Sequence, residues 1–273
     1  MRYSNVRVLF RLLITGIYIF LMAPFLFVAI SSVGDSAMLS FPPRSLTFQW
    51  YLQISPSLLD ALTVSLSAAL TTMIISSGLG IWVALAIARG RGALARILQL
   101  LSIAPLSVPH LALGIALYQA VLLLWDFSGV TLAGTFRGLV LGHSVIALPF
   151  VVRGVLAGHA QVNASVEEAA LSLGASPMQA FRNVTLPLIR SGLVSGAFLA
   201  FLASFDDVPV ALFMGGGEDS TTFPLQVLAS LEFSLKPDIM AISTLIVVVS
   251  VVIMVVLDYL FGLERFLHGQ SAD

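Results

Sequence analysis

The sequence contains no cysteine, and only 10% of its 273 residues are charged. Without cysteine the chain cannot form disulfides, thiolate metal sites or a cysteine nucleophile. The phosphate-binding pattern G-x-x-x-x-G-K-[ST], the zinc-binding pattern H-E-x-x-H and the nucleophile turn G-x-S-x-G are also missing. We therefore expect no catalytic site, no metal site and no ATP bound by a P-loop in this chain.

Apolar side chains are abundant instead: 58% of the residues are hydrophobic, and the mean hydropathy is +1.02. Values this high are typical of membrane proteins. Because lipid cannot hydrogen-bond the backbone, and the apolar runs lack the alternation of barrel strands, we expect an all-α membrane protein. Six stretches exceed the about 20 residues that a helix needs to cross a bilayer, at residues 12–33, 61–88, 97–125, 136–156, 193–214 and 240–263.

The distribution of arginine and lysine predicts the orientation of these six helices. With a cytoplasmic amino terminus, ten of the 13 basic residues lie on the inner side and three on the outer side. The positive-inside rule then predicts that both termini are cytoplasmic. It places the polar loop at residues 163–188 in the cytoplasm as well. The first apolar stretch is too long for the core of a signal peptide, so we expect it to remain as a membrane helix.

The polar loop contains the segment EEAALSLGASPMQAFRNVTLPL, which has clear helix boundaries. Ser165 and Glu168 form a capping-box pattern that starts a helix, and Gly174 is a typical residue to end it. Ser176 followed by Pro177 starts a second helix, and Pro187 marks a break before the next membrane span. The pattern therefore predicts two short helices joined by a sharp turn. An amphipathic connector lying on lipid headgroups is the alternative that helical periodicity leaves open.

The residue order in this loop favours the first interpretation. Glu168-Ala169-Ala170, three residues, Gly174, nine residues and then VTLP resembles the EAA loop of permease subunits of ATP-binding cassette (ABC) importers. Val184 stands where that motif usually has isoleucine, which is a small departure. The resemblance implies that the loop couples the chain to an ATPase through Glu168, Ala169, Ala170, Gly174, Ala175, Ser176, Pro177, Arg182 and Pro187.

The resemblance extends over nearly the whole length and implies the type I importer permease fold with six transmembrane helices. It is most specific to the second permease subunit of spermidine/putrescine-type importers, through FPPRSLTFQWY and residues 204–250. It implies a multi-pass protein of the bacterial cytoplasmic (inner) membrane that binds no cofactor and no nucleic acid. Its expected partners are the lipid bilayer, a cytoplasmic ATPase dimer that binds the ATP, a second and different EAA permease, and a periplasmic or extracellular substrate-binding protein.

Three polar residues inside the predicted spans are candidates for the substrate path. A charge at the centre of a membrane helix costs roughly 2.5–3.5 kcal/mol, so such residues usually face a cavity or a partner. Asp206 and Asp207 in the fifth span would attract a small cationic, polyamine-like solute, and His110 follows two prolines in the third. The alternatives are that an aspartate pairs with Arg137, that the helix ends early, or that His110 is an ordinary interhelical hydrogen bonder.

Two other classes of function are weaker interpretations of the same residues. A secondary transporter or channel that acts without an ATPase would be expected to show inverted repeats with broken helices, and no convincing repeat is present. A membrane enzyme would need a catalytic constellation, which the sequence lacks. We therefore expect a non-catalytic permease subunit of an ATP-driven importer.

Overall fold

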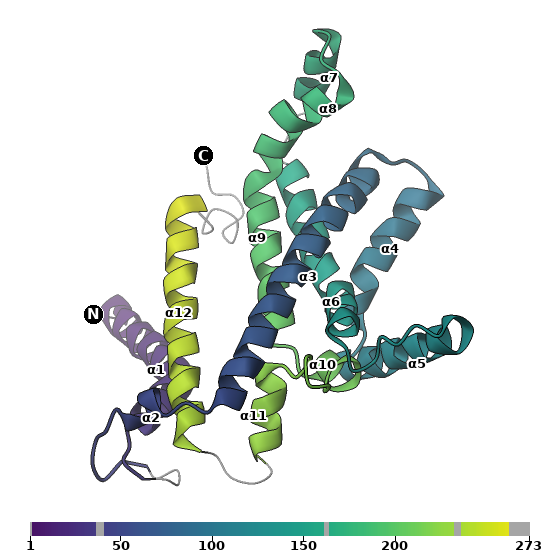
Figure 1. Ribbon diagram of the computed structural model, residues 1–273. Coiled ribbons are helices and arrows are strands. Elements are labelled where there is room, and N and C mark those ends of the chain that lie inside the picture. The colour runs from purple at the N-terminus through teal and green to yellow at the C-terminus, as the bar shows by residue number, and fades with distance from the viewer. Residues whose placement is uncertain (1, 37–40, 161–163, 232–235, 262–273) are drawn as a thin grey trace. The chain divides into compact units, whose positions relative to one another are not determined.

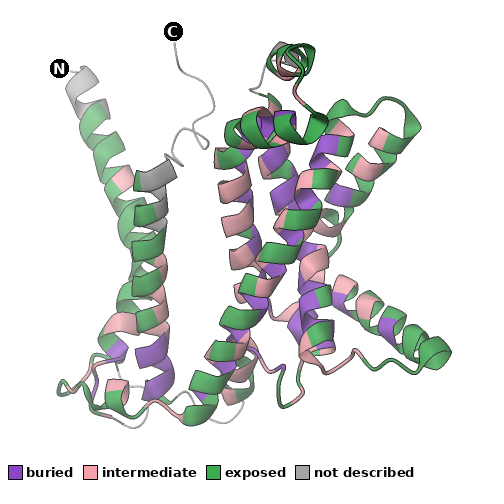
Figure 2. Ribbon diagram, turned by 45° about the horizontal axis from the view of Figure 1, so that its top comes forward, coloured by how far each residue is buried: buried purple, intermediate pink, exposed green. Residues whose placement is uncertain are grey.

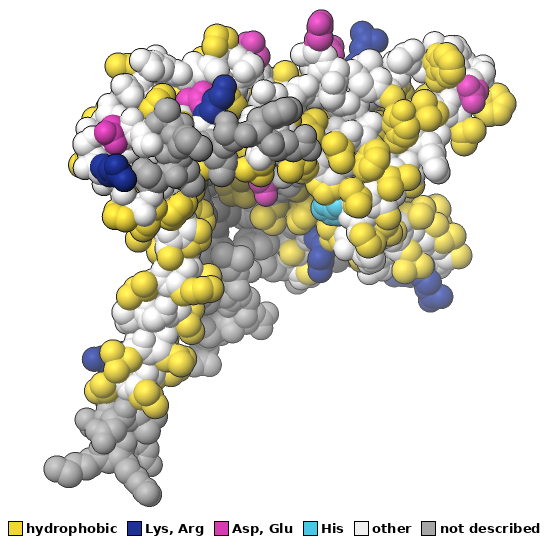
Figure 3. Space-filling view, turned by 90° about the horizontal axis from the view of Figure 1, so that it is seen from below, with side chains coloured by type: hydrophobic (Ala, Val, Ile, Leu, Met, Phe, Trp, Pro, Cys, Tyr) yellow, Lys and Arg dark blue, Asp and Glu magenta, His cyan; other side chains and the backbone are white. Residues whose placement is uncertain are grey.

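A computed structural model describes residues 2–36, 41–160, 164–231 and 236–261 of the chain (Figure 1). Two shorter apolar helices, Ala93–Ser107 and Pro237–Ile253, accompany five helices that are long and apolar enough to cross a membrane: Arg7–Ser31, Pro56–Arg89, His110–Ser128, Phe136–Ala160 and Pro177–Phe205. Exposed large hydrophobic side chains are numerous, and Figure 3 shows them over much of the surface, with few and scattered charges. The all-helical architecture is confirmed for the described residues, whereas the six spans and the orientation stay predictions.

The chain divides into two compact units, and the first comprises residues 1–59 and 227–257. In this unit the indole N–H of Trp50 donates to the Gly34 carbonyl at 2.6 Å. The Ser45 hydroxyl donates to the Asp35 carboxylate, which holds the pKa of that carboxyl below its ordinary value. These contacts order the segment between the first two helices. The helices of this unit are α1 (Arg2–Ser31), α2 (Gln49–Leu52) and most of α12 (Pro237–Phe261).

The second unit, residues 60–226 and 258–273, holds every predicted site residue. Its helices are most of α3 (Pro56–Arg89), α4 (Ala93–Ser107), α5 (His110–Ser128), α6 (Phe136–Ala160), α7 (Ala164–Ser172), α8 (Pro177–Ala180), the π-helix η1 (Phe181–Thr185), α9 (Leu186–Phe205), α10 (Pro209–Met214) and the start of α11 (Phe223–Leu231).

Helices α6 and α9 form the core of the second unit and approach each other through glycines. A Cβ atom on Gly154 would lie 2.3 Å from the carbonyl oxygen of Gly192, and one on Gly196 would lie 2.8 Å from that of Phe150. Small residues four positions apart allow membrane helices to pack this closely. Buried Val151 and Ile189 belong to the hydrophobic cluster around this contact, and the buried residues drawn in Figure 2 include those of α6, α9 and α3.

The predicted span 97–125 is two helices rather than one kinked helix. α4 ends at Ser107 and α5 begins at His110. Val108 takes the extended conformation, with φ −96° and ψ 135°, which the proline that follows it favours. Pro109 also lacks the N–H that would continue the helix. The chain therefore turns here, and α5 runs away from the direction of α4 (Figure 1).

The predicted span 193–214 differs from the structure at both ends. Its helix already begins in the loop and runs unbroken over Pro177–Phe205. It ends at Phe205, and a separate short helix, α10, starts at Pro209. Asp206 and Asp207 therefore lie in a link between helices rather than inside a membrane-spanning helix. The alternative that this helix ends early and leaves both aspartates wet holds only in part, because Asp207 is buried, with 5% exposure.

Candidate functional site

The first arm of the polar loop is α7, and it ends in a Schellman motif. The N–H of Ala175 donates to the Ala170 carbonyl at 3.1 Å, and the N–H of Gly174 donates to the Leu171 carbonyl at 3.0 Å. Gly174 has φ +92°, the left-handed conformation that this motif requires and that glycine adopts without strain. The predicted turn at Gly174 is confirmed. The expected capping box at Ser165 involves a side chain outside the described residues.

The second arm begins as predicted and then continues into the membrane helix. Ser176 and Gln179 form a capping box around the first turn of α8, with Pro177 in that turn. A π-turn follows, in which the Leu186 N–H donates to the Phe181 carbonyl, five residues back. The wider turn accommodates Pro187, which has no N–H to donate. The expected break at Pro187 is therefore wrong, and the arm is continuous with α9.

The loop projects beyond the helices of the second unit (Figure 1). Among the residues expected to couple to an ATPase, Glu168, Gly174 and Arg182 are exposed, and Ala175 is half-buried. The structure adds an apolar tip that the sequence analysis missed: Leu173 is 90% exposed and Met178 is 56% exposed. The tip follows from the turn, because residues beside a sharp reversal cannot pack against their own helix. An apolar residue next to Gly174 was the signal available in the sequence.

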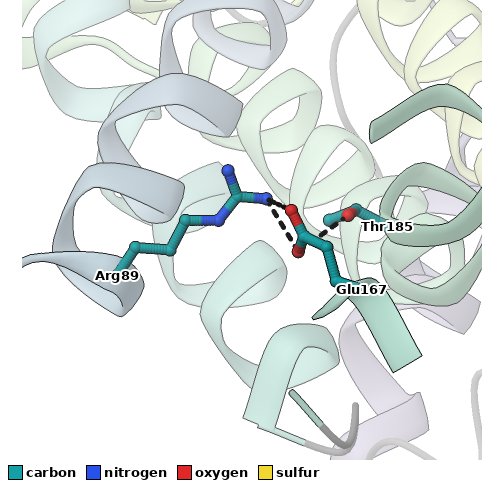
Figure 4. A network of polar contacts seen from close by, with 3 residues as sticks. All are labelled: Arg89, Glu167 and Thr185. Atoms are coloured by element: carbon teal, nitrogen blue, oxygen red, sulfur yellow. Dashed lines mark hydrogen bonds and ion pairs between the residues drawn. The ribbon is translucent and has the colours of Figure 1, made fainter. Parts of the chain in front are cut away.

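The base of the loop holds a second feature that the sequence did not indicate. Arg89, the last residue of α3, forms an ion pair with Glu167 at 2.6 Å, and the Thr185 hydroxyl donates to the same carboxylate at 3.1 Å (Figure 4). Arg89 and Glu167 are 78 positions apart in the chain. No motif spacing connects them, so only the fold reveals the contact.

The three residues predicted for the substrate path come close together from two elements. His110 is the first residue of α5 and lies near enough to Asp207 to interact with it electrostatically. A Cβ atom on Gly114 of α5 would lie 2.8 Å from the Pro209 carbonyl oxygen, so α5 and α10 are in backbone contact beside this group. Asp206 occupies the same link. The structure thus gathers one imidazole and two carboxylates, as a substrate path would need.

The two aspartates differ in their surroundings. The Asp207 side chain is buried, with 5% exposure, and its carboxylate accepts a hydrogen bond from the Val210 N–H at 2.9 Å. Asp207 therefore satisfies a backbone donor at the start of α10, which is a structural role. Asp206 is exposed. Among the described side chains neither carboxylate pairs with Arg137, and Asp206 alone of the two is open to the surroundings.

Comparisons with known proteins agree with this geometry. The family described as "Binding-protein-dependent transport system inner membrane component" matches residues 76–263. The molybdenum transport system permease protein ModB of Mycobacterium tuberculosis is 31% identical over 244 residues, which cover 87% of this chain and 90% of that protein. The spermidine/putrescine transport system permease protein PotC of Escherichia coli is 28% identical over 261 residues, 95% of each chain.

Further matches extend the comparison to another curated relative and to a solved structure. The putrescine transport system permease protein PotI of Escherichia coli is 29% identical over 232 residues, covering 84% of this chain and 82% of that protein. A bacterial ABC transporter involved in the import of the acidic polysaccharide alginate has a chain of similar fold, with a TM-score of 0.70 at 17% identity. That alignment covers 95% of this chain and 98% of the other.

Proposed function

The chain belongs to the family of binding-protein-dependent transport system inner membrane components, and on that premise we propose how it couples to its ATPase and what it carries. It is a permease subunit of an ABC importer, a multi-pass protein of the inner membrane. Such subunits are non-catalytic, and a separate subunit hydrolyses ATP. Family membership leaves the alternative of a self-sufficient channel without support.

We propose that the projecting loop, residues 164–185, seats the cytoplasmic ATPase. The observation that carries this proposal is an exposed, stiff element with an apolar tip. Leu173 and Met178 are the kind of side chain that fills a cleft of a partner. The second arm continues into α9 without a break, so a push on the tip reaches a membrane helix rather than being lost in a flexible linker.

The seating is tested by comparing two equally exposed apolar residues of the second unit. Leu173 at the tip and Phe127 at the end of α5 are each 90% exposed. We expect Leu173→Glu to reduce recovery of the ATPase with the purified permease by at least about tenfold, as loss of an interface anchor does. Phe127→Glu should leave recovery unchanged. Equal recovery with both variants would exclude the loop tip as the seat.

We propose that the solute is a small cation of the polyamine class, delivered by an external binding protein. The exposed Asp206 carboxylate next to Asp207 and His110 supports this proposal, as does the similarity to PotC and PotI, whose names specify spermidine and putrescine. A carboxylate at the entrance of a low-dielectric path attracts cations and repels anions. The translocation path would lie between this chain and a second, different permease.

The transport cycle that we propose is alternating access. Closure of the ATPase dimer on ATP moves the seated loop, and α9 carries that displacement across the membrane. The link after Phe205, where α9 ends and α10 begins, lies at the far end of the same helix. Movement of α9 therefore changes the surroundings of Asp206, which exposes the path first to one side of the membrane and then to the other.

A second candidate solute follows from ModB, whose name specifies molybdenum and which is 31% identical to this chain. Molybdenum in water is an oxyanion, so the two candidates carry opposite charge. Uptake of labelled putrescine and of molybdate should be measured in vesicles holding the complete importer. We expect putrescine uptake that falls in Asp206→Asn, with a parent-like ATPase content. Molybdate uptake that is unaffected by Asp206→Asn would overturn the assignment of a cation.

A further inference from the structure

The end of α3 is fastened to the first arm of the projecting loop. One guanidinium nitrogen of Arg89 lies 2.6 Å and 2.9 Å from the two carboxylate oxygens of Glu167 (Figure 4). The side chains of Arg89 and Glu167 are 46% and 21% exposed. An isolated ion pair with this exposure contributes little stability in water. Its importance depends on what else binds the same carboxylate.

A third element shares the Glu167 carboxylate. The hydroxyl of Thr185, the last residue of η1, donates to it at 3.1 Å, and Thr185 is buried with 1% exposure. Glu167 is therefore held between α3 on one side and the second arm of the loop on the other. Hydrogen bonds to a charged group are the stronger kind, and a group bound from two sides is more firmly placed than one in a single pair.

An aromatic contact joins α3 to the second arm independently. The rings of Trp82 on α3 and Phe181 on η1 stack with centroids 5.3 Å apart and planes inclined by 28°. Trp82 lies seven residues before Arg89, which is about two helical turns, so both side chains lie on the same side of α3. One face of α3 thus contacts α7 through a charge and η1 through a ring.

α3 also contacts the core of the second unit before its last turns. Ala68 is buried against Leu139 and Ala211. A groove of about 540 Å³ separates α3 from α6 between Thr71 and Leu79 on one side and Phe136 and Leu148 on the other. Close contact resumes at Gly80, where an added Cβ would lie 2.7 Å from Val151. α3 is therefore joined to the second unit along much of its length, and its last three turns add the contacts with the loop.

We propose that Arg89, Glu167 and Thr185, together with the Trp82–Phe181 stack, form a clamp that makes α3 and the projecting loop one rigid piece. The proposal rests on the proposed seating of the ATPase on this loop. The loop is covalently joined to α6 and α9 alone. The clamp adds α3, so that a displacement of the loop drives three membrane helices. These five residues are positioning residues, because they touch neither solute nor nucleotide.

A distance measurement tests the clamp without knowledge of the solute. The absence of native cysteine allows two spin labels to be introduced, at Leu171→Cys on the first arm of the loop and Ile74→Cys on α3, which are 41% and 66% exposed. Double electron–electron resonance is then recorded on the complete importer, without nucleotide and after trapping with ATP and vanadate. We expect one unchanged distance in both states. A parental distance that changes on trapping would overturn the clamp.

Three variants separate the clamp from general stability. Combining Arg89→Ala with Trp82→Ala should broaden the distance distribution and make its mean depend on the nucleotide state. The exchange Arg89→Glu with Glu167→Arg should restore the parental distance, and failure to do so would contradict the clamp even if the first variant cannot be purified. Arg91→Ala, in the same exposed turn, is the matched control and should behave like the parent.

Recovery of the ATPase with each variant distinguishes the two proposals. The clamp requires that the Arg89 and Trp82 variants keep the ATPase bound and hydrolysing ATP while the distance becomes state-dependent. If the parent chain itself retains no ATPase, the seating proposal fails and the clamp with it. If the parent retains the ATPase but its distance changes on trapping, the clamp alone is overturned.

Discussion

Two prolines on one helical path have opposite consequences. Pro187 lies in the first turn of α9, yet the helix passes through it, because a π-turn over Phe181–Thr185 removes the need for its missing N–H. Pro209 lies past the other end of α9 and starts a separate helix, α10, whose Val210 N–H is bound by Asp207. α9 is therefore continuous with the loop at one end, and a short link separates it from α10 at the other.

The difference follows from what surrounds each proline. Before Pro187, Thr185 is bonded to Glu167 of α7, and Phe181 is stacked on Trp82 of α3. These two contacts hold the helix in register through the π-turn. Before Pro209, the buried Asp207 carboxylate accepts a hydrogen bond from the Val210 N–H. The backbone therefore has a partner outside α9, and α9 ends at Phe205. The proposed transport cycle, in which α9 is pushed at the loop end and the path opens at its other end, needs this distribution of stiffness.

The largest effect is expected from separating α9 from α6, which would remove the stiff end altogether. Gly154→Leu would place a side chain on the backbone of Gly192, where even a Cβ atom would be 2.3 Å from the carbonyl oxygen. Forced overpacking costs about 1–3 kcal/mol or more, so we expect little folded protein by size-exclusion chromatography. Gly78→Leu on α3, where an added Cβ meets nothing within 4 Å, is the control and should purify normally.

A smaller effect is expected at the turn that aims the loop. Gly174→Val puts a β-branched residue at φ +92°, which costs roughly 1–2 kcal/mol, and the tip should lose its geometry. Gly129→Val, at φ +69° and ψ 6° at the end of α5, carries a comparable left-handed strain elsewhere, and an added Cβ there meets nothing within 4 Å. Both variants should lose similar thermal stability, but Gly174→Val alone should lose the ATPase on purification. Equal ATPase recovery would show that the Gly174 turn does not aim the seat.

The link between α9 and α10 is tested by replacing Asp207 and Asp206 separately. The first substitution should change the thermal stability and the second should change the KM. Asp207→Ala removes the buried partner of the Val210 N–H and should lower stability by about 0.5–2 kcal/mol, measured as a thermal midpoint. Asp206→Ala, at an exposed position, should leave the midpoint unchanged. It should raise the KM for a cationic solute by roughly fivefold, or about 1 kcal/mol of lost attraction. Identical effects from both substitutions would contradict their separate roles.

Local signals in the sequence predicted local structure well. The capping box at Ser176 and the left-handed turn at Gly174 are in place, because each depends on residues within one helical turn. Apolar composition predicted a membrane protein for a similar reason, because the preference of a segment for lipid depends on its own side chains and not on distant contacts. The resemblance in the loop led to the family that the comparisons now establish.

The contacts that complete the candidate site could not be predicted in this way. Arg89 and Glu167 meet only because the fold brings the end of α3 beside the first turn of α7. The sequence analysis assigned coupling to Glu168, the motif residue, whereas the carboxylate held by the fold is its neighbour Glu167. The break at Pro109 and the continuity at Pro187 were misjudged because a proline alone does not say whether the backbone will bend, break or widen its turn.

The smallest effect, and the sharpest test of the comparison, is expected from Pro187→Ala. Alanine has an N–H and would permit a regular α-helix, which favours the variant by its higher helix propensity. Returning to regular register, however, would rotate Phe181 and Thr185 away from Trp82 and Glu167. Because these terms oppose each other, we expect a change below about 1 kcal/mol, or roughly 2–4 °C in thermal midpoint. The Leu171–Ile74 spin-label distance should stay at its parental value, since the clamp rather than the proline holds the wide turn. A strongly stabilised variant with a changed distance would show that Pro187 forces the π-turn, and that the contacts with α3 are its consequence.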